Sequence, residues 1–449
     1  MFDCRVWLPL LLATTGLVLV ACSSTATQST STRPTLTTST TVARALAEPE
    51  DTTAFGNGET DADLSSTTTA DEFATDTEPG SDEASTSPPA EVESTTTSTS
   101  IAPEVAESPQ VTALLDELMP FVERERGLTF KSRPVVHVLD DDEFSAAFRK
   151  LVVDAAADEQ ELWDDFTDIY QLTGILRDST TLEETWLSFG DAGVLGYHEN
   201  RTGELTLRAG EITAFSKVVL VHELTHALDH QHFDLDRPEY DDDPSEIGWT
   251  FSALVEGSAT VIEDRYWASL STTELDEALT ARRSAGGSSF DQTASFLELQ
   301  FGRYRDGAEF AEALWAQGQA AVDAAFVNPP TTSEEIVEID FGLPTVRPAL
   351  ATPADGEIFE QGVWGQAAWY ALFLDHLTAA TALEATSGWG SDWFVAWRQG
   401  SRSCVRVHVE ADSEADLDQF FEAATIWAAA VGGEVFSPNA ETVRVTVCS

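Results

Sequence analysis

Two different periods of apolar positions run through residues 109–449, and together they predict a mixed α+β fold. Apolar side chains at helical spacing predict long helices at 111–125 and 247–270. Between them, the apolar run at the start of VVLVHELTHALDHQHFDLD (218–236) predicts another buried helix. Further helices are expected in the acid-rich stretch up to about residue 187 and at 361–379.

Strand patterns occur in the first third and in the last part of this region. PVVHVL (134–139) predicts a strand, and GVLGYHENRTGELTLR (193–208) predicts a hairpin with a polar turn at 200–203. The final stretch, CVRVHVE, DLDQFFEAATIWAAAV and ETVRVTVC, predicts a strand–helix–strand unit. A loop rich in proline and threonine, NPPTTSEE, interrupts the helical pattern in the middle.

The two ends of the chain differ sharply in composition. Residues 1–22 read as a signal peptide: the apolar run Val6 to Ala21 is too short to span a membrane comfortably and ends in LVAC. This ending resembles the bacterial lipoprotein box, so Cys22 is expected to be lipidated; the alternative is an ordinary secretion signal. Residues 23–108 are rich in Ser, Thr, Pro and acid, without apolar periodicity, and are expected to form a disordered stalk.

The expected folded region is therefore 109–449. We divide it into an α+β half at 109–232, a mainly helical half at 233–400 and an α/β unit at 401–449. The fold class expected is α+β and zincin-like, with a small sheet beside the active-site helix. The localisation expected is the extracellular face of the cell membrane, with a lipid anchor.

The net charge excludes one class of partner. The chain has 24 basic and 78 acidic residues, a formal charge of −54. The stalk holds 16 of the acids and two arginines, so about −40 remains on the folded region. Such a surface repels phosphates, and nucleic-acid binding is not expected.

Cysteine usage agrees with export. Cys4 would leave with the signal peptide and Cys22 would carry lipid, so Cys404 and Cys448 remain as a pair. In an oxidising compartment we expect these two to form a disulfide, the alternative being two buried thiols.

The motif HELTH carries the main chemical prediction. His222 and His226 are four positions apart, so on a helix both imidazoles lie on one face and can bind one metal ion. Glu223 between them then lies where HExxH zinc peptidases place their general base. We expect a Zn²⁺ site here; the alternative is a pair of structural histidines on a buried helix.

One candidate for the third ligand is His232, ten positions after His222 as in metzincins. Asp229, however, stands where that motif has a glycine that turns the chain, and aspartate adopts this backbone conformation less readily. Metzincins also carry a methionine turn after the motif. Both methionines of this chain, Met1 and Met119, precede it.

The other candidate is Glu256, in the segment ALVEGSA on the helix predicted at 247–270. A glutamate in such an apolar segment is costly to bury without a partner, and a metal ion would remove that cost. Small residues follow it and would allow this helix to approach the first closely. We favour Glu256, the pattern of gluzincins.

HELTHALDHQHFDL together with ALVEGSAT resembles a family of secreted bacterial proteins that are predicted metallopeptidases of the gluzincin type. NPPTTSEE and GWGSDWFVAW are also similar to that family, and the likeness covers most of 109–449. It implies zinc ligation by His222, His226 and Glu256 and the base role for Glu223. His230 departs from the family pattern and receives no ligand role.

The resemblance implies a membrane-tethered peptidase that hydrolyses peptide or protein substrates. A donor is then needed for the developing oxyanion, and the sequence offers several candidates without choosing among them. Asp264 could orient a metal-binding histidine. The candidate oxyanion donors are Tyr197, His198, His232 and Tyr266.

The alternative function is a non-catalytic surface lipoprotein with a structural zinc site that binds an envelope or protein partner.

Overall fold

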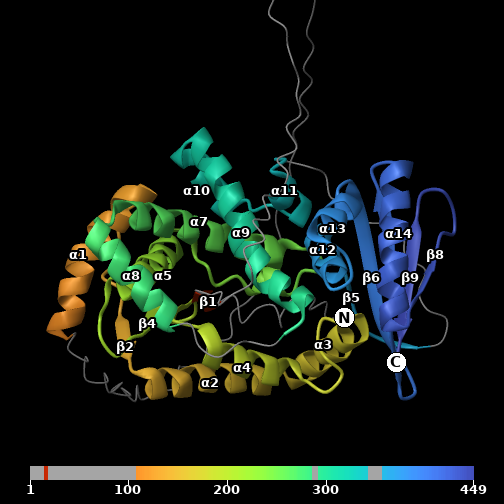
Figure 1. The fold of residues 1–449 in the computed structure, drawn as a ribbon, viewed down its shortest axis with the longest axis horizontal. Coiled ribbons are helices and arrows are strands. Elements are labelled where there is room, and N and C mark those ends of the chain that lie inside the picture. Colours follow the sequence, from red (N-terminus) through yellow and green to blue (C-terminus); the bar gives the residue numbers. More distant parts are fainter. Residues whose placement is uncertain (1–14, 19–107, 286–291, 342–355) are drawn as a thin grey trace, which may run out of the picture. The chain divides into compact units, whose positions relative to one another are not determined.

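The computed structural model describes residues 15–18, 108–285, 292–341 and 356–449 (Figure 1). Cys22 and the predicted stalk up to residue 107 lie outside these ranges, so the lipidation and disorder predictions are not addressed by them. None of the helices in the described ranges combines the length and the apolar character needed to cross a membrane.

A four-stranded sheet forms the first half of the fold, in the order β1-β3-β4-β2. The predicted hairpin is confirmed: β3 and β4 pair antiparallel, with Gly196 opposite Leu207. β2 pairs parallel to β4, and β1 pairs antiparallel to the other edge of β3. The strands are β1 (Thr15–Val18), β2 (Val136–Leu139), β3 (Gly196–Glu199) and β4 (Glu204–Arg208).

Four helices belong to this half, and α2 packs against β2 and β4. The Ser108 hydroxyl accepts a hydrogen bond from Val111 N at the start of α1, and Gly127 ends that helix at φ 76°. Asp140 and Glu143 form a capping box at the start of α2. The helices are α1 (Pro109–Arg126), α2 (Asp141–Asp158), α3 (Gln160–Thr173) and α4 (Leu182–Gly193).

Two buried helices, α5 (Ala214–Phe233) and α7 (Ile247–Ser269), form the centre of the molecule. Both were predicted, and α5 is buried almost all round because its apolar residues occupy every face. α1 and α8 pack against α5, and α9 packs closely against α7 (Figure 1). The remaining helices of this part are α6 (Pro238–Asp241), α8 (Thr272–Ala285), α9 (Ala294–Gln317), α10 (Gln319–Val327) and α11 (Ser333–Glu338).

The C-terminal part contains a five-stranded antiparallel sheet in the order β5-β6-β7-β9-β8. The predicted strand–helix–strand unit is present as β7 (Arg402–Ala411), α14 (Glu414–Val431) and β9 (Val443–Cys448). Helix α14 packs against β7, β8 and β9. The sheet also includes β5 (Glu357–Gly362), β6 (Trp389–Gln399) and β8 (Glu434–Phe436).

Two features of this part differ from the prediction. The helix expected at 361–379 is wrong at both ends: β5 runs to Gly362, α12 spans Gln366–Leu374, and α13 begins at Ala379 and ends at Thr386. Gly365, at φ 87°, separates strand from helix, a conformation that favours glycine. In addition, β6 pairs along its length with β7, so the C-terminal sheet begins before residue 401.

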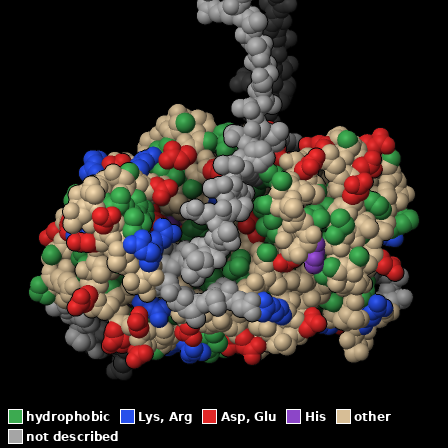
Figure 2. Space-filling model, in the orientation of Figure 1, with side chains coloured by type: hydrophobic (Ala, Val, Ile, Leu, Met, Phe, Trp, Pro, Cys, Tyr) green, Lys and Arg blue, Asp and Glu red, His purple; other side chains and the backbone are tan. Residues whose placement is uncertain are grey.

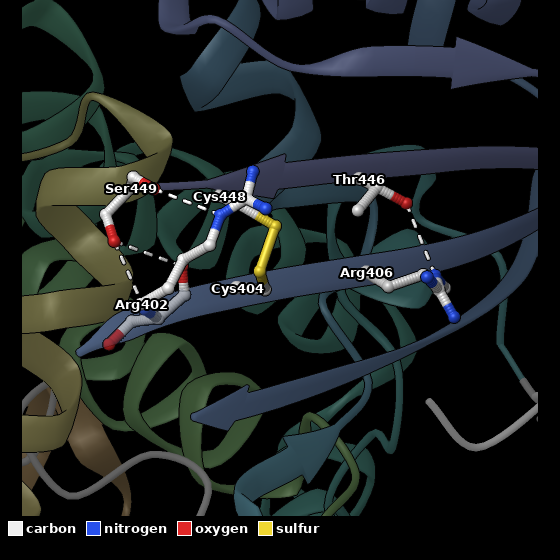
Figure 3. The surroundings of a disulfide bond; sticks show 7 residues. Arg402, Cys404, Arg406, Thr446, Cys448 and Ser449 are labelled. Atoms are coloured by element: carbon white, nitrogen blue, oxygen red, sulfur yellow. Dashed lines mark hydrogen bonds between the residues drawn. A yellow bond between two sulfur atoms is a disulfide. The ribbon is translucent and has the colours of Figure 1, made fainter. Parts of the chain in front are cut away.

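The predicted disulfide between Cys404 and Cys448 is confirmed (Figure 3). The two cysteines lie opposite each other on β7 and β9, with their Cα atoms 4.1 Å apart. Arg402 Nε donates a hydrogen bond to the Ser449 carbonyl oxygen beside them. The bond therefore joins strands that are already paired.

Candidate metal centre

His222, His226 and Glu256 form the one group within the described residues whose ligand atoms lie close enough to hold a metal ion, all within 4.8 Å of one another. Glu256 Oε2 lies 3.3 Å from His222 Nε2 and 3.4 Å from His226 Nε2. Each of the three side chains is at most 1% exposed. The structure thus places Glu256, the third ligand that the sequence favoured, beside the two histidines.

Helix packing explains this meeting. His222 and His226 lie one turn apart on α5, and α7 packs against α5 with Glu256 facing the two imidazoles. Position 257 carries no side chain, and this allows α9 to approach α7 from the other side: a Cβ there would lie 2.0 Å from the Gly307 carbonyl oxygen. Helix α7 is therefore held between α5 and α9.

The donor set fits a divalent transition metal. Glu256 Oε1 and both ring nitrogens of His226 are buried and have no hydrogen-bond partner in the structure. Two imidazoles and one carboxylate are the ligands of catalytic zinc sites, which leave a further position for water or substrate. A bound Zn²⁺ would satisfy buried groups that are costly to leave unpaired.

Without a metal, charge at the site is concentrated on one pair. Burial opposes a charge on His222, but hydrogen bonds with Glu256 and Glu263 raise its pKa to about 10. Burial also opposes ionisation of Glu256, but His226 and His222 lower its pKa to about 2. Burial lowers the pKa of His226 despite the nearby Glu256.

Glu223 lies beside this group and has no partner for its carboxyl. Both carboxyl oxygens are buried without a hydrogen bond. Burial raises the pKa of Glu223 well above its ordinary value, with the charge of His222 acting in the opposite direction. An unpaired carboxyl next to a metal site is suited to accepting a proton.

A carboxyl behind His222 fixes the orientation of that ring. His222 Nδ1 lies 2.9 Å from Glu263 Oε2, and the indole of Trp267 donates to Glu263 Oε1 at 3.1 Å. This is the contact that we considered for Asp264, its neighbour in the chain. Sequence reasoning missed Glu263, although it follows Glu256 by about two helical turns and therefore lies on the same face of α7.

His198 is fixed in one tautomer. Asn200 Nδ2 donates to the Leu235 carbonyl oxygen, so Asn200 Oδ1 faces His198 Nδ1 at 2.9 Å. An amide oxygen can only accept a hydrogen bond, so Nδ1 of His198 carries the ring proton and donates. Nε2 of His198 is then an unprotonated acceptor, buried without a partner. The ring centre lies 6.4 Å from that of His226, but this tautomer cannot donate to an oxyanion.

The other three predicted oxyanion donors lie elsewhere. His232 Nε2 contacts the Thr129 carbonyl oxygen at 2.8 Å. Tyr266 packs edge-on against Phe121, with ring centres 5.0 Å apart. Tyr197 lies between the rings of Phe144 and Phe148. A phenol that the sequence did not single out, Tyr304 on α9, lies beside a candidate ligand, with its ring centre 6.2 Å from that of His222.

Asp229 shows why the metzincin-like geometry does not form. Helix α5 continues through this position to Phe233 instead of turning away, so His232 points towards the loop after α1. The Asp229 carboxylate is buried and accepts hydrogen bonds from Arg126 Nε at 2.6 Å and Ser258 Oγ at 3.0 Å. These contacts join α5 to α1 and α7.

No protein-family model matches the chain, and neither the curated proteins nor the solved structures give a match.

Proposed function

We propose that the chain is a zinc-dependent peptidase, exported and tethered to the outer face of the cell membrane through Cys22. The observation that carries the proposal is a buried group of His222, His226 and Glu256 with an unpaired carboxyl, Glu223, beside it. Bound zinc would lower the pKa of a coordinated water and polarise a scissile carbonyl.

The residues of the chain would divide the remaining work. Glu223 would accept a proton from the attacking water and return it to the leaving amine nitrogen. Glu263 would hold His222 in the tautomer that presents Nε2 to the metal. His226 would present Nε2 in the same way from the next turn of α5.

An extended peptide is the substrate that β3 can accommodate. The edge of β3 that faces away from β4 pairs antiparallel with β1, a segment inside the predicted signal peptide. β1 also contacts α5 and α7, the helices that carry the site. Removal of the signal peptide would leave this edge open to a substrate strand, which would pair through its main chain.

A structural zinc site in a non-catalytic lipoprotein is the second candidate. It is favoured by the burial of the three side chains, each at most 1% exposed, which limits the access of a substrate to the site. A structural site, however, has no use for an unpaired Glu223, whose burial is a cost without chemistry. The two candidates therefore differ in what Glu223 does.

The experiment counts zinc per folded chain and measures digestion of a peptide library by residues 109–449. We expect Glu256→Ala to lose most of its zinc, because it removes a ligand, and His232→Ala to keep it. We expect Glu223→Gln to keep about one zinc per chain while hydrolysis falls by orders of magnitude. Zinc retained by Glu256→Ala and lost by His232→Ala would overturn the ligand set. Zinc-loaded protein that cleaves no peptide would favour the structural site.

A further inference from the structure

β3 meets the active-site helix through two alternate residues. Gly196 and His198 share one face of the strand, as residues two positions apart do. His198 lies beside His226, and Gly196 lies against Glu223. A Cβ added at Gly196 would stand 2.7 Å from Glu223 Oε1 and 3.0 Å from Val219 Cγ1.

The backbone conformation at position 196 does not require a glycine. The φ angle of Gly196 is not positive, so its conformation is open to any residue. Glycine within a strand weakens it, because it costs chain entropy and offers no side chain for packing. The remaining reason for a glycine here is steric, because the carboxyl of Glu223 occupies the volume that a side chain at 196 would need.

Packing rather than hydrogen bonding sets the position of that carboxyl. Neither oxygen of Glu223 has a hydrogen-bond partner in the structure, so no donor fixes its rotamer. The atoms against it at β3 are those of Gly196, and those of Val219 lie one turn before it on α5. A change at either position would move the carboxyl without removing it.

We propose that Gly196 is a positioning residue for Glu223, which keeps the carboxyl within reach of the water that it deprotonates. The inference rests on the proposed peptidase function. A methyl group at 196 meets the side chains of Glu223 and Val219 rather than backbone, so we expect the fold and the metal ligands to be retained while the carboxyl is displaced. A displacement of about 1 Å is enough to cost on the order of 100-fold in rate.

The test compares Gly196→Ala with Gly210→Ala in zinc-loaded protein. Gly210 is a matched control, because a Cβ there would meet nothing within 4 Å and its φ is not positive. We expect Gly196→Ala to keep its zinc and its thermal midpoint and to lose kcat on the order of 100-fold with little change in KM. An unchanged kcat in Gly196→Ala overturns the proposal.

A second test combines Gly196→Ala with a shorter side chain at position 223. Glu223→Asp withdraws the carboxyl by one methylene, so it no longer reaches the volume of the added methyl. Gly196→Ala should then cost little further in a Glu223→Asp background, whereas independent effects would multiply. Multiplying losses would show that the methyl acts on something other than this carboxyl. If Gly196→Ala alone does not fold, folding of the double variant supports the collision, and its failure to fold overturns it.

One readout is independent of hydrolysis. The ¹³C resonance of the Glu223 carboxyl, assigned by its loss in Glu223→Gln, should shift in Gly196→Ala and stay in place in Gly210→Ala. A resonance that does not shift overturns the positioning role, whatever the substrate. Shifted resonances in a protein that cleaves no peptide would leave the contact intact and count against the peptidase function alone.

Discussion

At the scale of single residues, the two histidines of the candidate metal centre differ in what supports them. His222 contacts a carboxylate at Nδ1, Glu263, which favours the tautomer with Nε2 free for a metal. The support of His226 is weaker: Nδ1 has no partner in the structure, and the nearest ring on β3 is the neutral His198. Substitutions behind His222 should therefore affect the metal most.

Glu263→Gln should lower zinc affinity by about 10- to 100-fold, the usual effect of removing a carboxylate behind a metal-binding histidine. Asp264→Asn is the matched control, because Asp264 is the adjacent residue of the same helix and the structure gives the contact with His222 to Glu263. Competition with a chromophoric chelator measures both affinities. Equal losses in the two variants would mean that general charge near the site, rather than the hydrogen bond, matters.

The sequence predicted the grouping of the candidate ligands better than it predicted their surroundings. His222, His226 and Glu256 followed from helical spacing and from the cost of a buried acid, which are properties of single helices. Glu263 and Gly196 matter through contacts between elements, and no spacing rule connects them to His222 or Glu223. The tautomer of His198 likewise depends on Asn200 and on a carbonyl 35 residues further along the chain from Asn200.

At the scale of elements, the site depends on how closely α7 and α9 approach. A Cβ at Gly307 would lie 1.9 Å from the Ala253 carbonyl oxygen, one turn before the metal ligand on α7. This contact is with backbone, so it cannot be relieved by a side-chain rotation. The two helices would have to separate, and Glu256 would move with α7.

Gly307→Ala should therefore destabilise the protein by about 1–3 kcal/mol or more, as overpacking in a close-packed core does, and should weaken zinc binding. Gly302→Ala on the same helix is the control: its Cβ would meet the end of the Glu298 side chain at 3.0 Å rather than the backbone of another helix. Glycine to alanine in a helix otherwise gains up to about 1 kcal/mol. Denaturant unfolding measures both; equal stabilities would show that the close approach does not constrain α7.

The elements that the sequence missed lack a clear period. WGSDWFVAWRQ forms β6, the second strand of the C-terminal sheet, and is buried over most of its length, so its apolar residues do not alternate. Helices α5 and α7 are buried on all sides as well, but their length identified them. The hairpin β3–β4 was visible because a polar turn separates its two strands.

At the scale of the whole molecule, acidic residues outnumber basic ones by 78 to 24, and some of the acidic side chains are buried. Figure 2 shows Asp and Glu side chains spread over the visible face rather than gathered in one patch. Several carboxyls are buried, and burial raises the pKa of Glu246, Glu334 and Glu360 to about 8 in each case. The fold therefore holds protons that the unfolded chain would release at neutral pH.

The stability of the protein should fall as pH rises through this range. A carboxyl whose pKa is about 8 when folded, against an ordinary 4.5, is protonated in the folded state while the unfolded chain has ionised. Its stabilising contribution is present below the unfolded pKa and is lost as pH rises through the folded pKa. Each unit of difference corresponds to about 1.4 kcal/mol, so the loss from one such group reaches several kcal/mol at most.

Glu246 provides the sharpest test of this dependence, because it is 1% exposed and its Oε2 accepts a hydrogen bond from Ser333 N that a glutamine oxygen can also accept. Glu246→Gln cannot ionise, so its stability relative to the native chain should rise between about pH 5 and pH 8. Glu239→Gln, at a side chain 58% exposed, is the control and should follow the native chain throughout. Urea unfolding at several pH values measures the three proteins, and the difference between them cancels the pH dependence of the metal site. Parallel curves for Glu246→Gln and the native chain would show that Glu246 is already ionised in the fold at neutral pH, with its charge balanced by donors such as Ser333 N.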